Sequence, residues 1–592
     1  MRFAEYSGCG GKKSYKLPFC ERFDGAGMKG LSRRGAARLL SSRALALALA
    51  GAAAIAPHAA ARPPAPAHVL HAFLTNSEAG LDPAVASDLA SLSLLENIFD
   101  PLLRYDYLAR PVRLQPNTLT AMPTVENNGL NYIFHLQPGI QFTPDPAFNG
   151  AQREVTAQDY VYSLKRLSDP ALKSPWQFLT EGISSLEALD RYTLRIHLKA
   201  PDPNFLFYLA IPATGVVARE VVEAYGSQVG NHPVGTGPFR IGQWKHSDQI
   251  TLLANPGFRK VEFQGHRLPQ LERIEIKIVE EYQSRVLGFL NGEFDYLEQL
   301  PESMKDMALT DATTPTLKPE LAKKGIVLTP FPVMQTYYMW MNTEDPLIGG
   351  YSKEKIALRR AIALSYNSKE DIALLKKGLA LPAQTPLPPN VLGYDASYRS
   401  PTQYDPALAR ALLDRFGYRV GTDGFRTQPN GQPLTLVMHS DATMVGRLRD
   451  EMWRKCLNAV GLRVEFKSDK KTEIIKASRL GKVMMYETNW IADFPDGDNF
   501  YQLLYGPNSG RANYARFNLP AYNERYEKSR QLDDSPERTK LYGEMAQLLH
   551  AYAPWVLLTH PISADLRQPW LKNYVRHPVE FTNWRYIDVD AY

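Results

Sequence analysis

The last third of the chain alternates strand-like and helix-like segments, and this alternation restricts the possible fold more than any other feature. Two strand-like segments, residues 434–440 and 462–468, flank an amphipathic segment over 445–461. Another strand-like run follows at 483–490. Short strands separated by a helix are typical of β-α-β units, which build parallel sheets. The sequence therefore predicts α/β lobes.

Earlier segments add further predicted elements. Residues 156–170 begin with Thr before an amphipathic run and stop at Asp-Pro, which predicts a capped helix. Residues 130–142 alternate apolar and polar side chains around a Pro-Gly pair, which predicts a hairpin. Residues 335–343 read as a strand with aromatic side chains on both faces.

The N-terminal segment has the order of an export signal. Residues 28–43 are basic and lack acidic side chains, 44–56 are apolar or small, and 59–61 are Ala-Ala-Ala. We expect translation to start at Met28 and cleavage to fall before Arg62, so that residues 1–61 are a leader and signal peptide. The apolar run is shorter than the roughly 20 residues that span a bilayer.

Charge and cysteine content narrow the class of the exported part. Residues 1–61 hold 10 of the 68 Lys+Arg and 3 of the 62 Asp+Glu, so 58 basic and 59 acidic side chains remain. A nearly neutral chain gives no general electrostatic case for nucleic acid or an anionic membrane. Cys456 is the only cysteine left, so the fold depends on its core and not on an internal disulfide.

The sequence lacks the common catalytic motifs after the leader. It contains no H-E-x-x-H, C-x-x-C, G-x-S-x-G or Walker loop. The stretch NWIADFPDGDNF (489–500) instead gathers Asp493, Asp496 and Asp498 beside aromatic side chains. Their spacing does not match an EF-hand, and a glycosidase pair cannot be judged from spacing. A turn accounts for the presence of Asp496 and Asp498, because Asp side chains in turns accept hydrogen bonds from the nearby backbone. A turn does not account for the placement of Trp490 and Asp493 together where a strand ends.

Read in order, these segments resemble the oligopeptide- and dipeptide-binding family of solute receptors of ABC importers. The series includes YIFHLQPGIQFTPD, REVTAQDYVYSLKRLSDP, GTGPFRIGQW, NGEFDYL, TYYMWMN, LRRAIALSYN and NWIADFPDGDNF. The resemblance implies a two-lobed periplasmic binding protein of type II, with an extra inserted subdomain and a ligand cleft between lobes joined by a hinge. It implies a first lobe of 62–332 plus 562–592, an insertion at about 110–212, and a second lobe of 333–561. The crossings between lobes are expected near 333–342 and 557–561.

The resemblance also suggests ligand-binding residues. The WIAD tetrad resembles the segment in which relatives use the Asp to receive a peptide's α-ammonium, which indicates Asp493, with Trp490 as a pocket wall. TYYMWMN resembles a strand that borders the ligand, which makes Tyr337, Tyr338 and Asn342 candidates. Some oligopeptide receptors carry an Arg three residues before the Trp. This chain has Glu487 there, and a carboxylate at that position would favour a cationic ligand.

Function follows from the resemblance as an expectation. The chain is expected to be a monomeric periplasmic receptor that hands a peptide to an inner-membrane permease, with no catalytic residues, cofactor, metal or nucleic acid. The alternatives are the same scaffold with another cargo, such as haem, a metal chelate, a sugar or an opine, and a secreted hydrolase.

Overall fold

The computed structural model describes residues 68–301, 304–310 and 314–591, and the predicted leader at 1–61 lies outside them. Within this part of the chain, no helix is both long and apolar enough to cross a membrane. The described chain has separate hydrophobic cores, and we call the parts built on them the first and second lobes. The core of the first lobe combines residues from 70–276 with residues from 571–589. The cores of the second lobe draw on residues 334–558.

The first lobe contains a four-stranded sheet in the order β1-β12-β9-β8. The strand β1 lies parallel to β12, and the remaining neighbours are antiparallel. The bounds of these strands are β1 (Val69–Leu74), β8 (Phe239–Lys245), β9 (Gln249–Ala254) and β12 (Arg273–Ile278). Smaller pairs complete the lobe: β2 (Leu103–Tyr105) with β3 (Leu114–Pro116), β10 (Glu262–Phe263) with β11 (His266–Arg267), and β21 (Leu571–Lys572) with β22 (Asp588–Val589).

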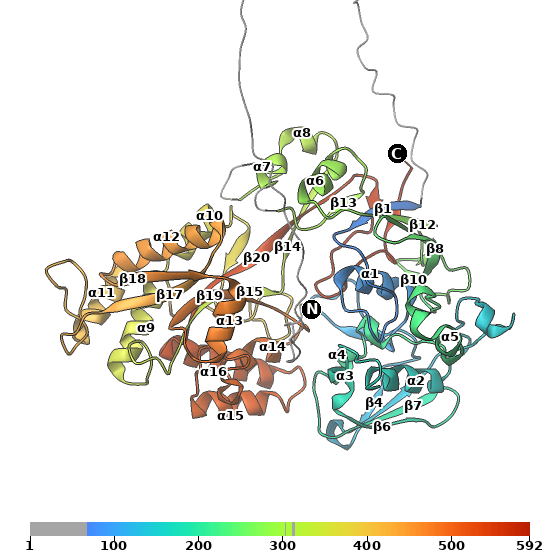
Figure 1. The fold of residues 1–592 in the computed structure, drawn as a ribbon, viewed down its shortest axis with the longest axis horizontal. Coiled ribbons are helices and arrows are strands. Elements are labelled where there is room, and N and C mark those ends of the chain that lie inside the picture. Colours follow the sequence, from blue (N-terminus) through green and yellow to red (C-terminus); the bar gives the residue numbers. More distant parts are fainter. Residues whose placement is uncertain (1–67, 302–303, 311–313, 592) are drawn as a thin grey trace, which may run out of the picture. The chain divides into compact units, whose positions relative to one another are not determined.

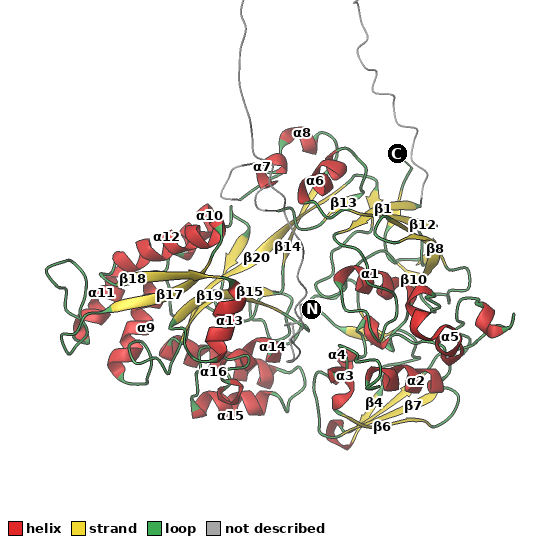
Figure 2. Cartoon of the chain, in the orientation of Figure 1, coloured by secondary structure: helices red, strands yellow, loops and turns green. Residues whose placement is uncertain are grey.

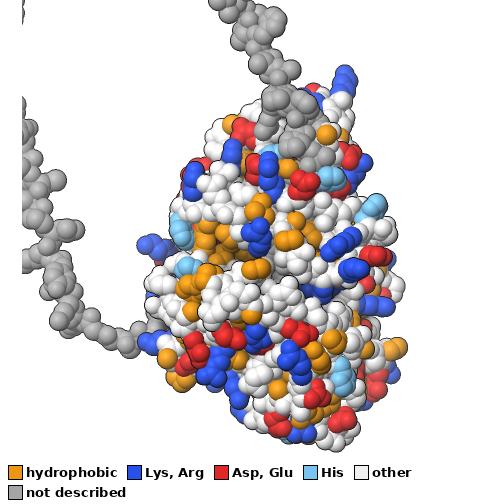
Figure 3. Space-filling model, turned by 90° about the vertical axis from the view of Figure 1, so that its right-hand side faces the viewer, with side chains coloured by type: hydrophobic (Ala, Val, Ile, Leu, Met, Phe, Trp, Pro, Cys, Tyr) orange, Lys and Arg blue, Asp and Glu red, His pale blue; other side chains and the backbone are white. Residues whose placement is uncertain are grey.

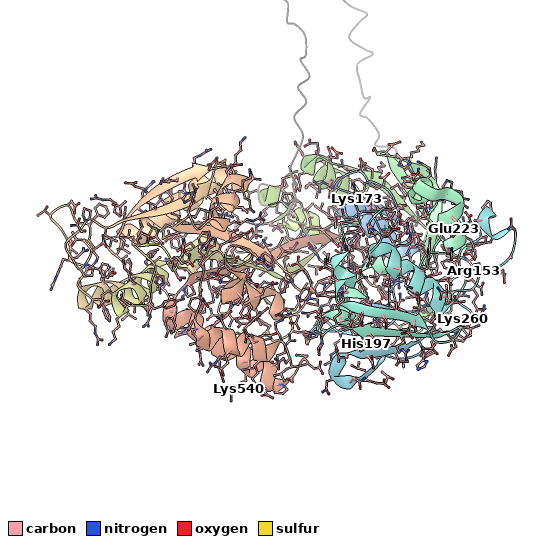
Figure 4. All side chains as sticks on the ribbon, turned by 60° about the horizontal axis from the view of Figure 1, so that its bottom comes forward. Arg153, Lys173, His197, Glu223, Lys260 and Lys540 are labelled. Atoms are coloured by element: carbon pink, nitrogen blue, oxygen red, sulfur yellow. The ribbon has the colours of Figure 1, made fainter. Side chains whose placement is uncertain are left out.

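A second, antiparallel sheet in the order β4-β5-β7-β6 falls within residues 110–212. Its strands are β4 (Thr124–Glu126), β5 (Asn131–His135), β6 (Ile183–Ala188) and β7 (Thr193–Leu198), and α2 (Ala157–Leu167) packs on it. The predicted helix cap is confirmed, because the Asp159 carboxylate accepts the Thr156 amide at 2.7 Å. Arg153, labelled in Figure 4, donates to the other oxygen of Asp159 at 2.6 Å.

The hairpin predicted over 130–142 is wrong in its second half. The strand β5 pairs with β4 and β7, whereas Gln141 makes a single bridge to Glu154. The Pro-Gly turn leads the chain away from β5 into a loop. A local alternation pattern shows that a strand forms but does not name its partner.

An eight-stranded sheet with the main path β13-β20-β15-β19-β17-β18 organises the second lobe, and its strands β13 and β14 come from residues outside 334–558. Strands β17, β18 and β19 are mutually parallel, which confirms the predicted β-α-β units. The strands are β13 (Tyr296–Leu297), β14 (Val327–Pro332), β15 (Gln335–Met341), β16 (Ala380–Pro382), β17 (Thr435–Asp441), β18 (Arg463–Asp469), β19 (Met485–Ile491) and β20 (Trp555–Arg567).

Helices cover both faces of this sheet (Figures 1 and 2). Met339 of β15 belongs to a core with α9 (Lys353–Ser365), α11 (Pro406–Arg415) and α12 (Met444–Asn458). Tyr338, the next residue of the strand, belongs to a core with α15 (Pro520–Ser529) and α16 (Pro536–Tyr552). Alternation along a strand sends neighbouring side chains to opposite faces, so both faces of β15 are apolar. This explains why aromatic and apolar residues occur on both faces of the strand predicted over 335–343.

The remaining helices of the described chain are short. They are α1 (Leu89–Ile98), α3 (Phe178–Glu181), α4 (Phe205–Tyr208), α5 (Arg219–Tyr225), α6 (Tyr282–Leu290), α7 (Lys305–Ala308), α8 (Pro319–Ala322), α10 (Ser368–Leu374), α13 (Lys471–Arg479) and α14 (Asp498–Tyr501).

The two predicted crossings lie beside each other. The long strand β20 pairs with β14 through Ile562–Arg567 and with β15 through Trp555–Thr559. At the junction of β14 and β15, the Val333 amide donates to the Pro561 carbonyl at 3.0 Å. The two segments at which the chain is expected to cross between the lobes are therefore hydrogen-bonded neighbours. The lobe boundaries stay a prediction.

Acidic and basic side chains intermingle on the face of the molecule that Figure 3 shows. This distribution agrees with the nearly balanced charge of residues 62–592 and does not form one basic stripe on that face.

Candidate functional site

The carboxyl ends of three strands meet at one edge of the second-lobe sheet. Because β17, β18 and β19 are parallel, their carboxyl ends lie on the same side of the sheet, at Asp441, Asp469 and Ile491, with β19 extending further than the other two. The strand β15 runs antiparallel to β19 and starts at this edge, with Gln335 opposite Ile491. In α/β sheets, loops at the carboxyl edge are the usual position of a ligand site. The stretch 489–500 is one of these loops.

Asp493 is held by a buried amide. Asn499, which is 0% exposed, donates through Nδ2 to Asp493 Oδ2 at 3.1 Å. The Asn499 Oδ1 atom accepts the Trp490 Nε1 hydrogen at 2.7 Å and the Asp493 amide at 3.2 Å. One amide therefore fixes both the indole and the carboxylate. Asp493 itself is exposed, and its Oδ1 has no hydrogen bond to the described residues.

Asp496 and Asp498 have structural partners. The Asp496 carboxylate accepts two hydrogen bonds from Arg538, at 2.6 and 2.8 Å, and both side chains are buried. The same carboxylate accepts the Asp498 amide at 2.8 Å, as expected for a turn-forming Asp. Asp498 Oδ2 accepts a hydrogen bond from Asn204 of the first lobe at 3.3 Å. The described residues contain no group of three His, Cys, Asp or Glu side chains that could hold a metal ion.

The loop also contacts the first lobe through an aromatic side chain. Phe494 meets Tyr208 edge to face, with ring centroids 6.4 Å apart. Phe494 and Leu392 further pack in a small apolar cluster with Tyr105 and Phe207 of the first lobe. The segment that carries the exposed carboxylate therefore makes apolar and polar contacts across the lobes.

Glu487 is engaged on both oxygens by its own lobe. Oε2 accepts the Trp453 indole hydrogen at 2.8 Å, and Oε1 lies 3.2 Å from Arg449 Nε. Its side chain is 11% exposed. A carboxylate with a cation and an indole donor as partners does not present an unbalanced negative charge. This environment weakens the electrostatic preference that the sequence suggested for position 487.

The three candidates on β15 lie in different environments. Tyr337 is partly buried, with the Lys376 ammonium 4.0 Å and the Arg449 guanidinium carbon 5.4 Å from its ring centroid. Tyr338 is 3% exposed and stacks on Trp555 with centroids 3.8 Å apart. Asn342 is 2% exposed and donates to the Gly481 carbonyl at 3.1 Å. Roles for these residues in ligand contact stay predictions.

Sequence reasoning missed Asn499, Lys376 and Arg449. Asn499 stands inside the quoted loop, and its amide type and position after the turn were the available signal. Lys376 and Arg449 come from α10–β16 and α12, and no local pattern connects them to Tyr337. Their proximity depends on the tertiary fold.

Arg538→Ala tests how strongly the loop is anchored. Removing the guanidinium leaves the Asp496 carboxylate buried without its cation, so the free energy of unfolding should fall by about 3–5 kcal/mol. Urea unfolding followed by tryptophan fluorescence measures the change. The matched control is Arg530→Ala, because the Arg530 side chain is 51% exposed and lies 3.6 Å from Asp498. Equal losses for the two variants would contradict the anchoring role.

Comparison with known proteins agrees with this architecture. The family model of bacterial extracellular solute-binding proteins, family 5, matches residues 113–512. The chain is 27% identical to di/tripeptide-binding protein 2 of Pseudomonas aeruginosa, covering 80% of this chain and 88% of the relative. It is 26% identical to heme-binding protein A of Haemophilus influenzae, covering 79% and 83%.

Solved structures share the two-lobed fold. HbpA2 of Haemophilus parasuis aligns with a TM-score of 0.75 at 19% identity, covering 88% of this chain and 100% of that one. The DppA binding protein of Helicobacter pylori, in complex with peptide STSA, aligns with a TM-score of 0.63 at 23% identity, covering 88% and 98%. The expected fold class is therefore confirmed, and the chain belongs to the bacterial extracellular solute-binding proteins of family 5.

Proposed function

We propose that this protein is the periplasmic receptor of an ABC importer, that it captures a short peptide through its free amino terminus, and that it passes the unchanged peptide to an inner-membrane permease. The observation that carries the proposal is the exposed Asp493 carboxylate, oriented by Asn499 at the carboxyl edge of the second-lobe sheet. Relatives named for di/tripeptides and for glutathione support a peptide-like solute.

The chemistry of Asp493 suits an ammonium group. Enclosing an ammonium between two lobes costs several kcal/mol unless a counter-charge and hydrogen-bond acceptors replace water. Asp493 Oδ2 is held by Asn499, which leaves Oδ1 to accept from a ligand N–H. Trp490 lies beside it and offers an aromatic face, which attracts cations by about 0.5–2 kcal/mol.

The paired strands support capture by closure. The junction of β14 and β15 runs beside β20, so a change of backbone angles near Val333 and Pro561 would rotate one lobe against the other. The contacts of Phe494 with Tyr208, and of Asp498 with Asn204, join the lobes next to the anchor. Closure of this kind excludes water around the ammonium and strengthens its pairing with Asp493.

Binding without turnover is part of the proposal. The family is a family of binding proteins, and the polar groups at this edge are engaged in positioning one another. We further propose that the receptor acts as a monomer and that residues 1–61 are removed on export, which takes away the excess positive charge of the full chain.

Asp493→Ala tests the anchor. Loss of the carboxylate leaves the bound ammonium without a counter-charge, so affinity for a randomised tripeptide pool should fall at least about 30-fold. Isothermal titration calorimetry on the purified proteins measures this change. Asp534→Asn removes an exposed acidic group from the same lobe and should bind as the wild type does. N-acetylated peptides should bind both wild type and Asp493→Ala weakly. Undiminished affinity of Asp493→Ala for free-amine peptides would refute the assignment.

Asn499→Ala tests the orientation of that carboxylate. Without the amide, Asp493 keeps its charge but loses its fixed geometry, so free-amine peptides should bind about tenfold more weakly. The N-acetylated pool should bind Asn499→Ala and wild type equally, which separates a lost orientation from general damage. A parallel loss for both pools would show that Asn499 acts only through the stability of the loop.

A further inference from the structure

A cavity of about 510 Å³ lies in the first lobe, among residues that take no part in the site at Asp493. One wall is the segment 141–152, which follows β5, and a second is the turn at 232–234. The third wall combines residues 240–241 of β8 with the turn at 255–257 after β9. Small-molecule sites commonly occupy about 300–1,000 Å³. This cavity therefore has room for a small organic ligand.

Hydrogen bonds connect the walls of this cavity to one another. The Thr143 amide donates to the Gly235 carbonyl at 2.9 Å, which ties the first wall to the loop at 235–238. The buried Asn255 side chain donates to the Gly237 carbonyl at 2.9 Å, which ties the turn after β9 to the same loop. A site whose walls are already fixed loses less conformational freedom when a ligand binds. The cavity is therefore preformed for binding.

Arg240 brings a positive charge without a partner to the lining. It is partly buried, and its guanidinium makes no hydrogen bond or ion pair with the residues that the structure describes. Asp145 is the carboxylate in the lining, and it accepts the Tyr225 hydroxyl at 3.1 and 3.2 Å and the Ala147 amide at 2.9 Å. A guanidinium presents several N–H donors in one plane and pairs well with an oxyanion. The cavity therefore favours a ligand with an anionic group.

A stacked ring pair and a buried amide oxygen define the rest of the ligand. His232 in the lining stacks on Tyr225, with ring centroids 3.8 Å apart and planes inclined by 4°. Tyr225 covers one face of the imidazole, so the other face is left for a planar ring of a ligand. The Gln141 Oε1 atom is buried without a hydrogen-bond partner in the described chain, and a ligand N–H or O–H would satisfy it. Pro144 and Pro233 add apolar wall.

We propose that this cavity is a second binding site, which takes a small anion that combines a planar ring with an N–H or O–H donor. Arg240 pairs with the anionic group, the ring stacks on His232, and the donor meets Gln141 Oε1. A ligand held in this way joins the segment 141–152 to the four-stranded sheet of the first lobe. The inference goes beyond the proposed function and does not rest on it, because Asp493 has no part in this site.

The test compares two fluorescent probes by titration. Anilinonaphthalene sulfonate carries an oxyanion, aromatic rings and an N–H donor, whereas phenylnaphthylamine has the same rings and N–H without the charge. The wild type should bind the anionic probe saturably and at least tenfold more tightly than the neutral probe. Arg240→Gln should lose this preference while binding the neutral probe as the wild type does. The matched control is Lys245→Gln, which removes an exposed charge from the same strand and should keep the preference.

A second variant and a competition locate the bound probe. Ala151→Trp fills the cavity from its exposed rim and should weaken the binding of both probes at least tenfold. An excess of the randomised tripeptide pool should leave the anionic probe in place. Thermal melting without probe checks the folding of Arg240→Gln, and Ala151→Trp decides the outcome if that variant does not fold.

Four results would overturn this second site. They are no binding of the anionic probe by the wild type, equal affinity of the wild type for the two probes, displacement of the anionic probe by tripeptides, and anionic-probe affinity unchanged in folded Arg240→Gln or in Ala151→Trp. None of these results bears on peptide capture by Asp493, which calorimetry measures separately.

Discussion

The structure depends on the long strand β20, which pairs with β13, β14, β15 and β16. The strand β20 pairs with β14 along its C-terminal half and with β15 along its N-terminal half, while β14 leads directly into β15. The hydrogen bond from Val333 to Pro561 marks the point where both segments pass together. The hydrogen bonds between the two neighbouring segments fix their register, so the segments do not slide past each other. Both segments can still bend at the same point, which would let the lobes rotate about a hinge. This arrangement suits a receptor that closes on its solute.

The chemistry of the candidate site follows from the arrangement of the strands in the second-lobe sheet. Parallel strands bring several loop ends to one edge, and there a buried amide, Asn499, fixes the indole of Trp490 and the carboxylate of Asp493. The Arg538–Asp496 ion pair holds the rest of the loop. Asp496 and Asp498 are buried and hold the loop, so Asp493 is the one exposed carboxylate among the three aspartates of this stretch. Binding by such a group requires no proton transfer and no nucleophile.

Much of this fold could be predicted from the sequence. The β-α-β alternation predicted strands β17, β18 and β19 and helix α12, because these elements depend on local periodicity. Residues 156–170 gave a correct helix start, since Thr156 and Asp159 are close in sequence. The hairpin after β5 failed because strand pairing is a tertiary property, and β5 pairs instead with β7, more than 50 residues later. The resemblance to the family predicted Asp493 as a ligand-binding residue. The side chains that fix the geometry of Asp493 and that balance the charge of Glu487 are brought there by the tertiary fold, so the sequence did not predict them.

The central claim is that Asp493 holds the amine of a solute that stays chemically unchanged. Native mass spectrometry of wild type and Asp493→Asn, purified side by side from an exporting host, tests it most directly. The account predicts that the wild type carries an amine-bearing solute, released with the mass of the free compound, and that Asp493→Asn carries none of it. The same solute on both proteins, or a bound solute that has no amine, would contradict the account.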